Sequence, residues 1–123
     1  MTDQEFRELA EQWMKTRALA IEASRTYGAL SAELQFFKLP RAVEHLEEAT
    51  TAYARVDTLM ESSRTAYSDS QALWQEVNKL DVQVRAILPP GIWYRVNGKG
   101  IMHQFGVATQ IMDWEDVLEK VAQ

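Results

Sequence analysis

Apolar and small residues recur at alternating spacings of three and four along residues 3–38. Ten positions carry this repeat: Phe6, Leu9, Trp13, Thr16, Ala20, Ala23, Tyr27, Leu30, Leu34 and Phe37. A seven-residue repeat keeps one stripe of a helix against a partner helix. The pattern therefore predicts a long helix over about 3–38, capped at its start by Thr2 or Asp3. Gly28 is its weak point, because glycine costs about 1 kcal/mol relative to alanine in a helix interior.

A second tract repeats the pattern over about 41–88 without a skip. One of its seven-residue series is bulky and the other is small through its middle: Leu46, Tyr53, Met60, Tyr67 and Trp74 against Ala49, Val56, Ser63 and Ser70. Large residues facing small ones let closely spaced helices interlock, so this face is interpreted as a packing seam. Ser68 and Gln71 form a possible capping box. We nevertheless predict a single helix, starting after Pro40 and ending at Pro89, because no glycine or proline interrupts the tract.

Residues 91–123 switch to the period of two that is typical of strands. Asn97-Gly98 lies between two alternating runs, which is the strongest short-range signal for a β-hairpin. The side chains expected to face inward are Ile92, Tyr94, Val96, Ile101, His103 and Phe105, and those expected to face outward are Trp93, Arg95, Met102 and Gln104. From Gln110 onward, apolar residues return to helical spacing at Ile111, Trp114, Val117, Leu118 and Val121, with Asp113 as a plausible N-cap.

The predicted fold class is mainly α: two long antiparallel helices in a coiled-coil-like hairpin over 1–88, followed by a small β-hairpin and a short helix over 91–123, packed in the same domain. Helices of these lengths would extend about 55 and 70 Å. Such a two-helix rod leaves part of each apolar stripe in water, and pairing with a second copy would cover it. We therefore expect a homodimer. The candidate residues of its seam are Trp13, Tyr27, Tyr53, Met60, Tyr67 and Trp74.

Composition narrows the chemistry. The chain has no cysteine, which excludes disulfides, thiolate metal sites and cysteine nucleophiles. Its 46% hydrophobic content is too high for disorder, and 18 acidic against 13 basic residues give a net charge of −5. An acidic start differs from a signal peptide, and no stretch reaches the about 20 apolar residues of a membrane span. The expected location is the cytoplasm, or the host cytoplasm if the protein is viral.

An enzymatic alternative rests on a group of carboxylates. Glu44-x-x-Glu47 corresponds to the first half of the paired motif of all-helical, magnesium-dependent nucleotide pyrophosphohydrolases, and Glu48 adjoins it. The second half, Glu-x-x-Asp, is absent, so Asp69 or Glu76 would have to supply it. A solvated acidic turn beside Arg41 explains the same residues. We predict no catalytic, cofactor-binding or metal-binding residue.

The outer hairpin face is the best candidate for contact with another protein. Tryptophan and arginine are frequent at binding hot spots, which selects Trp93 and Arg95, together with Met102 and Lys99. The competing interpretation is that the last helix covers this face, with Trp114 packed on Trp93. Nucleic-acid binding through Trp93, Arg95, Lys99 and His103 is a further alternative, although no part of the chain is net basic. The sequence favours a non-enzymatic interaction protein, such as an assembly factor, adaptor, small chaperone or binding inhibitor.

Overall fold

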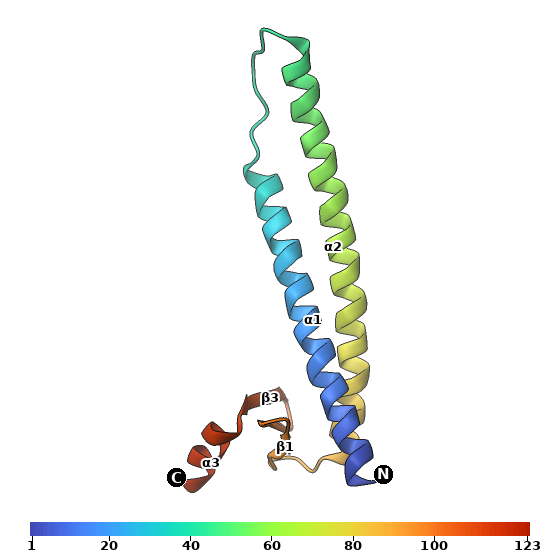
Figure 1. Ribbon diagram of the computed structural model, residues 1–123, viewed down its shortest axis with the longest axis vertical. Helices are drawn as coiled ribbons and strands as arrows, with labels where there is room; N and C mark the ends of the chain where they lie inside the picture. Colours follow the sequence, from blue (N-terminus) through green and yellow to red (C-terminus); the bar gives the residue numbers. More distant parts are fainter. The chain divides into compact units, whose positions relative to one another are not determined.

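The computed structural model describes residues 1–123 and is mainly helical. Its elements are α1 (Asp3–Phe36), α2 (Leu46–Ile87), β1 (Tyr94–Val96), β2 (Lys99–Gln104), β3 (Val107–Asp113) and α3 (Trp114–Ala122). The chain divides into two compact units. We call Ala18–Trp74 the helix-pair unit, and Met1–Arg17 with Gln75–Gln123 the sheet unit. Both α1 and α2 run through both units, and they pack side by side in an antiparallel hairpin (Figure 1).

The predicted helical hairpin is confirmed, with one boundary in error. Thr2 caps α1, because the Glu5 amide donates a 3.1 Å hydrogen bond to the Thr2 hydroxyl and that hydroxyl donates to the Glu5 carboxylate. α2 continues through Ser68 without a break. It begins at Leu46, however, and not after Pro40. Residues 41–48 are all exposed, so no tertiary packing stabilises an earlier turn, and the first turn forms where the Glu48 amide bonds the His45 carbonyl.

Serine hydroxyls make polar contacts between α1 and α2 in the helix-pair unit. The hydroxyl oxygens of Ser24 and Ser70 lie 2.9 Å apart, and those of Ser31 and Ser63 lie 3.4 Å apart. The Ser24 hydroxyl also accepts a 2.8 Å hydrogen bond from the indole Nε1 of Trp74. Seven residues separate the two serine pairs on each helix. Moving one residue toward the C-terminus of α1 therefore corresponds to moving one residue toward the N-terminus of α2.

The bulky series predicted to lie in the α2 seam lies beside it instead. The residues of α2 that turn toward α1 are the predicted small series and a second series one position away from the bulky one: Val56, Ser63 and Ser70 with Leu59, Ala66 and Leu73. One position along a helix turns a side chain by about 100°. The paired serine hydroxyls occupy the space between the two helices at these levels. Tyr53, Met60 and Tyr67 consequently stay 60%, 38% and 50% exposed.

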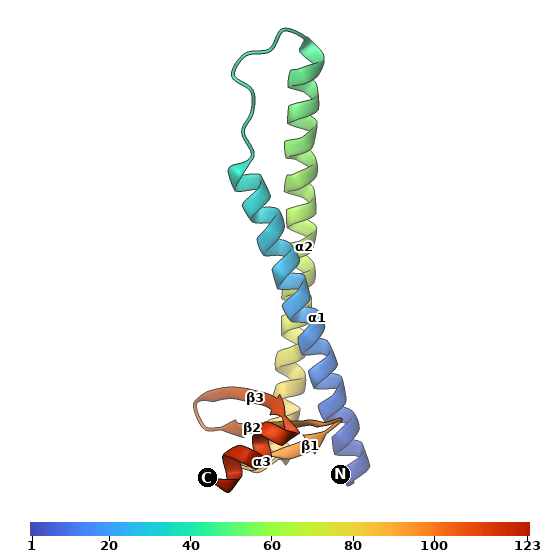
Figure 2. The ribbon, with the colours of Figure 1, turned by 60° about the vertical axis from the view of Figure 1, so that its left-hand side comes forward.

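The sheet has three antiparallel strands in the order β1-β2-β3 (Figure 2), one more than predicted. Asn97 and Gly98 both have positive φ, 49° and 76°, and they join β1 to β2 as the sequence predicts. A second turn at Phe105-Gly106 joins β2 to β3, with Gln104 paired to Val107. Phe105 was expected inside but lies at this turn, where it is fully exposed, and Ile92 is exposed ahead of β1.

α3 covers one face of this sheet. Asp113 occupies the N-cap position as predicted, and the Trp114 amide donates a 2.9 Å hydrogen bond to the Gly98 carbonyl. Gly100 on β2 lies under α3, because a Cβ built there would be 2.7 Å from Val117 and 3.2 Å from the Trp114 ring. The face predicted to point outward is therefore partly covered.

The hydrophobic core is unevenly distributed between the units. Eleven of the fourteen buried apolar residues belong to the sheet unit, among them Trp13, Val84 and Ile101. The helix-pair unit contributes only Ala20, Leu59 and Ala66. Because helices in proteins depend on packing of an apolar face for most of their stability, the helix-pair unit has little of its own to stabilise it.

Candidate interaction surfaces

A row of exposed apolar side chains of the helix-pair unit runs along α2. We call Leu46, Tyr53, Met60 and Tyr67, with half-buried Trp74, the aromatic column. Its members recur every seven residues, so they lie above one another on the helix. The Tyr67 ring contacts the ring of Tyr27 on α1, with ring centroids 5.2 Å apart and planes tilted by 56°. Large apolar groups aligned in water indicate an interaction surface.

Trp13, Tyr27 and Trp74, three of the six predicted seam residues, have contacts within one copy of the chain, and Trp74 is half-buried with its indole bonded to Ser24. Trp13 is only 2% exposed and belongs to the core of the sheet unit. Tyr27 is half-buried between the helices. Trp74 and the other three seam candidates belong to the aromatic column. The structure thus retains Tyr53, Met60, Tyr67 and Trp74 as residues that a second chain could contact.

A groove lies between α1 and α2 on another face of the helix-pair unit. We call it the acidic groove; its volume is about 410 Å³, and Ala23, Thr26, Leu30, Thr65 and Ala66 line much of it. Glu61 and Asp69 also line it, and neither forms an ion pair. Arg55, about one turn and a half before Glu61 on α2, is bonded to Glu33. Sequence patterns did not reveal this groove, because it depends on how two distant tracts align.

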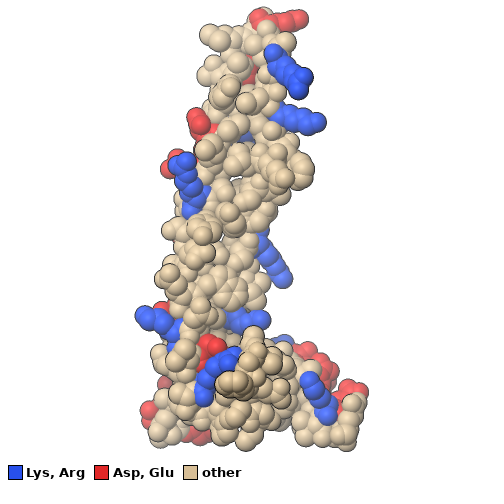
Figure 3. All heavy atoms as spheres, turned by 180° about the vertical axis from the view of Figure 1, so that it is seen from behind, with Lys and Arg blue, Asp and Glu red and all other residues tan.

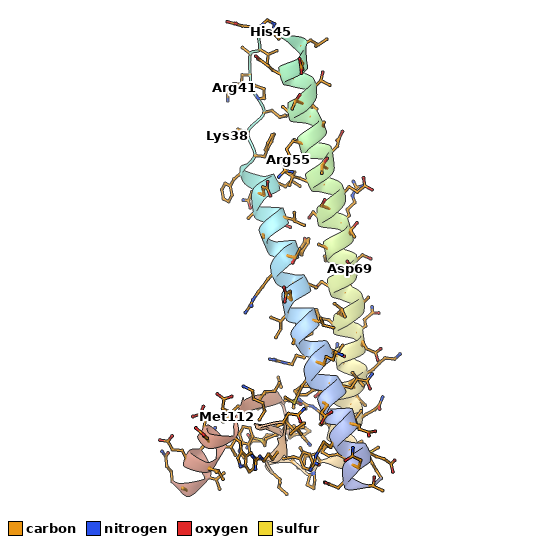
Figure 4. All side chains as sticks on the ribbon, viewed as in Figure 1. Lys38, Arg41, His45, Arg55, Asp69 and Met112 are labelled. Carbon is orange, nitrogen blue, oxygen red and sulfur yellow. The ribbon has the colours of Figure 1, made fainter.

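The connector between α1 and α2 carries unpaired basic residues. Lys38, Arg41 and His45 project from it, whereas Arg55 reaches from α2 toward α1 (Figure 4). On the face of the helix pair shown in Figure 3, basic and acidic side chains are scattered singly between uncharged ones. They form no continuous basic band there of the kind that binds nucleic acid.

The four hairpin candidates are distributed differently from the prediction. Met102 is buried, with 5% of its surface exposed, so it is not part of an outer face. Trp93 is half-buried, and its ring lies near Gly100 and 5.8 Å from the Lys120 ammonium. Arg95 is exposed and lies 5.8 Å from the Trp114 ring, and Lys99 is bonded to Asp113. The structure therefore resembles the competing interpretation, in which α3 covers much of this face.

A polar network joins β3 to α2 in the sheet unit. The Thr109 hydroxyl donates a 2.5 Å hydrogen bond to Asp81, whose other carboxylate oxygen lies 2.9 Å from Arg85 Nε. Arg85 also donates to the Val107 carbonyl at 2.8 Å. The register places Ala108 and Thr109 opposite the single residue His103, a bulge that redirects a strand side chain. This contact was not predicted from the sequence; the signal that could have found it is Asp81, a charged residue within an apolar repeat.

His103 faces inward as predicted. It is buried, and its Nε2 bonds the Leu88 carbonyl just after α2, while its own carbonyl accepts a 2.8 Å hydrogen bond from the Gly91 amide. These contacts attach the segment after α2 to β2. The nucleic-acid alternative counted His103 in a patch around the hairpin, and the structure buries this residue.

The carboxylates of the enzymatic alternative do not come together. Glu44 lies in the connector, and Glu47 and Glu48 are exposed in the first turn of α2. Asp69 follows Glu48 by twenty-one residues of continuous helix, which is about 30 Å. No three His, Cys, Asp or Glu side chains in the chain gather into a group that could hold a metal ion.

Tyr94 connects β1 to the start of α1. Its hydroxyl donates a 2.8 Å hydrogen bond to the Asp3 carboxylate, and its ring packs edge-on against Phe6 with centroids 4.8 Å apart. Burial raises the pKa of the Tyr94 hydroxyl, and the hydrogen bond and negative charge of Asp3 raise it further, against a smaller lowering by Arg7. The neutral phenol is thus the form that the folded sheet unit favours.

The raised pKa of the Tyr94 hydroxyl is expected to be visible in solution. In an ultraviolet absorbance titration, one component should titrate above the ordinary tyrosine pKa of about 10, and Tyr94→Phe should remove that component. Because the folded-state pKa is raised, the associated stability is fully present below pH 10 and is lost as pH rises through the folded pKa. A titration curve that Tyr94→Phe leaves unchanged at high pH would contradict this assignment.

Comparisons of the chain with protein-family models, curated proteins and solved structures find no match. No helix is both long enough and apolar enough to cross a membrane.

Proposed function

We propose that this is a non-enzymatic interaction protein that works as a homodimer, assembled through its helix-pair unit. The observation that carries this proposal is the contrast between the two units. The helix-pair unit buries three apolar residues, two of them alanines, yet exposes Leu46, Tyr53 and Tyr67 by half or more. Burial of apolar surface is the main favourable term in association, and a second copy would supply the missing core.

The sheet unit is the proposed point of contact with another protein. Arg95, exposed beside the Trp114 ring, and Lys99 remain at its surface, and Phe105 projects fully into water from the β2–β3 turn. Arginine and aromatic residues are enriched at binding hot spots. In this proposal the helix pair sets the geometry of the dimer, and each sheet unit offers one surface to a partner.

The oligomeric state tests the proposal directly. Light scattering or sedimentation equilibrium at micromolar concentration should give twice the chain mass of 14.1 kDa. The double variant Tyr53→Gln/Met60→Gln should raise the dimer dissociation constant at least about a hundred-fold, because it places amides where apolar contacts are needed. Both side chains are exposed in one copy, so the substitutions remove no packing within the chain.

The matched control is Phe105→Gln, which replaces an exposed aromatic side chain of the sheet unit and should leave the dimer mass unaltered. A 14.1 kDa monomer at all concentrations would overturn the proposal. A dimer equally weakened by Phe105→Gln would move the interface to the sheet unit.

A further inference from the structure

Gly28 is an unusual residue at the middle of a helix. It is the only glycine within α1 and α2, and glycine is among the least favourable residues in a helix interior. It is exposed, and a Cβ built on it would meet no atom within 4 Å. Packing inside one copy of the chain therefore does not require glycine. What the residue provides is a notch on the surface of α1.

Gly28 and Tyr67 lie on the same face of the helix pair. Thr26 and Leu30 line the acidic groove, and Gly28 is two residues from each of them, which turns it about 200° away around the helix. Tyr67 is likewise two residues from Thr65 and Asp69, which line the same groove on α2. The notch and the aromatic column are thus both opposite the groove.

Gly28 and Tyr67 also lie at the same height. The serine pairs Ser24–Ser70 and Ser31–Ser63 set the antiparallel register, and the Tyr27–Tyr67 ring contact falls between them in that register. Gly28 directly follows Tyr27. One face of each helix pair consequently offers a half-exposed tyrosine on α2 and, one helix across, a notch at the same level on α1.

We propose that two copies pack face to face about a twofold axis parallel to the helices, so that Tyr67 of each copy fits into the notch at Gly28 of the other. This proposal rests on the proposed homodimer and adds its geometry. Rotation about such an axis places α2 of one copy against α1 of the other without changing height. Tyr67 of each copy then meets the notch of its neighbour, as knobs meet holes in helical bundles.

The alternative twofold axis runs across the helices. It would set α2 against α2 and α1 against α1, so tyrosines would oppose the aromatic column and the two notches would face each other. Both axes make every neighbouring helix antiparallel, as in four-helix bundles, so the choice between them rests on which side chains meet. Steps of seven residues from Tyr67 and Gly28 bring Trp74 level with Ile21, and Met60 level with Gln35. Shape complementarity therefore selects the parallel axis.

Substitution of the notch tests the contact. Gly28→Leu should improve the intrinsic helix propensity of α1 but raise the dimer dissociation constant at least about tenfold, because the added side chain occupies the space proposed for Tyr67. Thr26→Leu is the matched control, since it places the same side chain on the opposite face and should leave the dissociation constant unchanged. Sedimentation equilibrium measures both, and circular dichroism checks the helix content.

The direction of the axis is tested by a distance. The chain has no cysteine, so Thr51→Cys gives a single attachment site for a spin label, on an exposed position of α2. Parallel copies keep the two labels at equal height, within about 35 Å. An axis across the helices at the level of Tyr67 would separate them by about 50 Å, because sixteen residues of helix lie between Thr51 and that level on each copy.

The outcomes separate this proposal from the broader one. A dimer with a short label distance that Gly28→Leu weakens and Thr26→Leu does not would support the notch contact. A dimer with a distance near 50 Å, or one indifferent to Gly28→Leu, would overturn this geometry and leave homodimerisation standing. A monomer at every concentration would overturn both.

Discussion

Replacing Trp13 by alanine is expected to lower the free energy of unfolding by about 3–5 kcal/mol, the range typical of large aromatic deletions in a core. Trp13 is 2% exposed, and Phe6 and Ala10 are buried on the same side of α1. All three belong to the sheet unit, where most of the apolar core is found. Because the side chain is enclosed, neither solvent nor a surface group can fill the space. Urea unfolding followed by far-ultraviolet circular dichroism measures the change.

Trp13→Phe provides the matched comparison. The indole Nε1 of Trp13 is buried with no hydrogen-bond partner in the chain, so part of the gain from burying the ring is offset by an unsatisfied donor. Phenylalanine removes that donor and keeps an aromatic ring. Trp13→Phe should therefore cost much less than Trp13→Ala. Equal losses for the two variants would show that the site tolerates no change of shape.

The helical hairpin could be predicted from sequence because two long tracts carry the same seven-residue repeat. The face of α2 that packs on α1 could not be predicted in the same way. The bulky series from Leu46 to Trp74 and the series from Leu59 to Leu73 differ by a single position, and both are apolar enough to form a seam. Contacts between residues far apart in sequence, such as Ser24 with Ser70, decide between them. The repeat within each helix does not show which residue of α1 pairs with which residue of α2.

The missed strand has a different cause. Ile111 and Trp114 are three residues apart, which fits a helix, but Val107, Thr109 and Ile111 also alternate as a strand requires. The pairing of β3 with β2 settles the ambiguity in favour of the strand up to Asp113. Once β3 and α3 are in place, Met102 is covered. Met102 was thus placed correctly on the hairpin. Its burial could not be predicted, because the strand β3 was not recognised in the sequence.

Gly100 is the residue through which α3 packs closely on the sheet. The nearest ring carbons of Trp93 and Trp114 would each lie 3.2 Å from a Cβ at this position, and the Val117 methyl group would lie 2.7 Å away. Val117 is 1% exposed and so has no free space into which to turn. A side chain on Gly100 can therefore be accommodated only if α3 moves away from β2.

Gly100→Ala is accordingly expected to destabilise the protein by about 1–3 kcal/mol, the usual cost of an extra methyl group in a packed site. Val117→Ala should also destabilise it, by leaving a cavity. The double variant should lose less stability than the two single losses together, because the shortened Val117 side chain makes room for the new Cβ. Urea unfolding followed by tryptophan fluorescence measures all three. Strictly additive losses would mean that the two positions do not touch, and α3 would then be docked on the sheet by other residues.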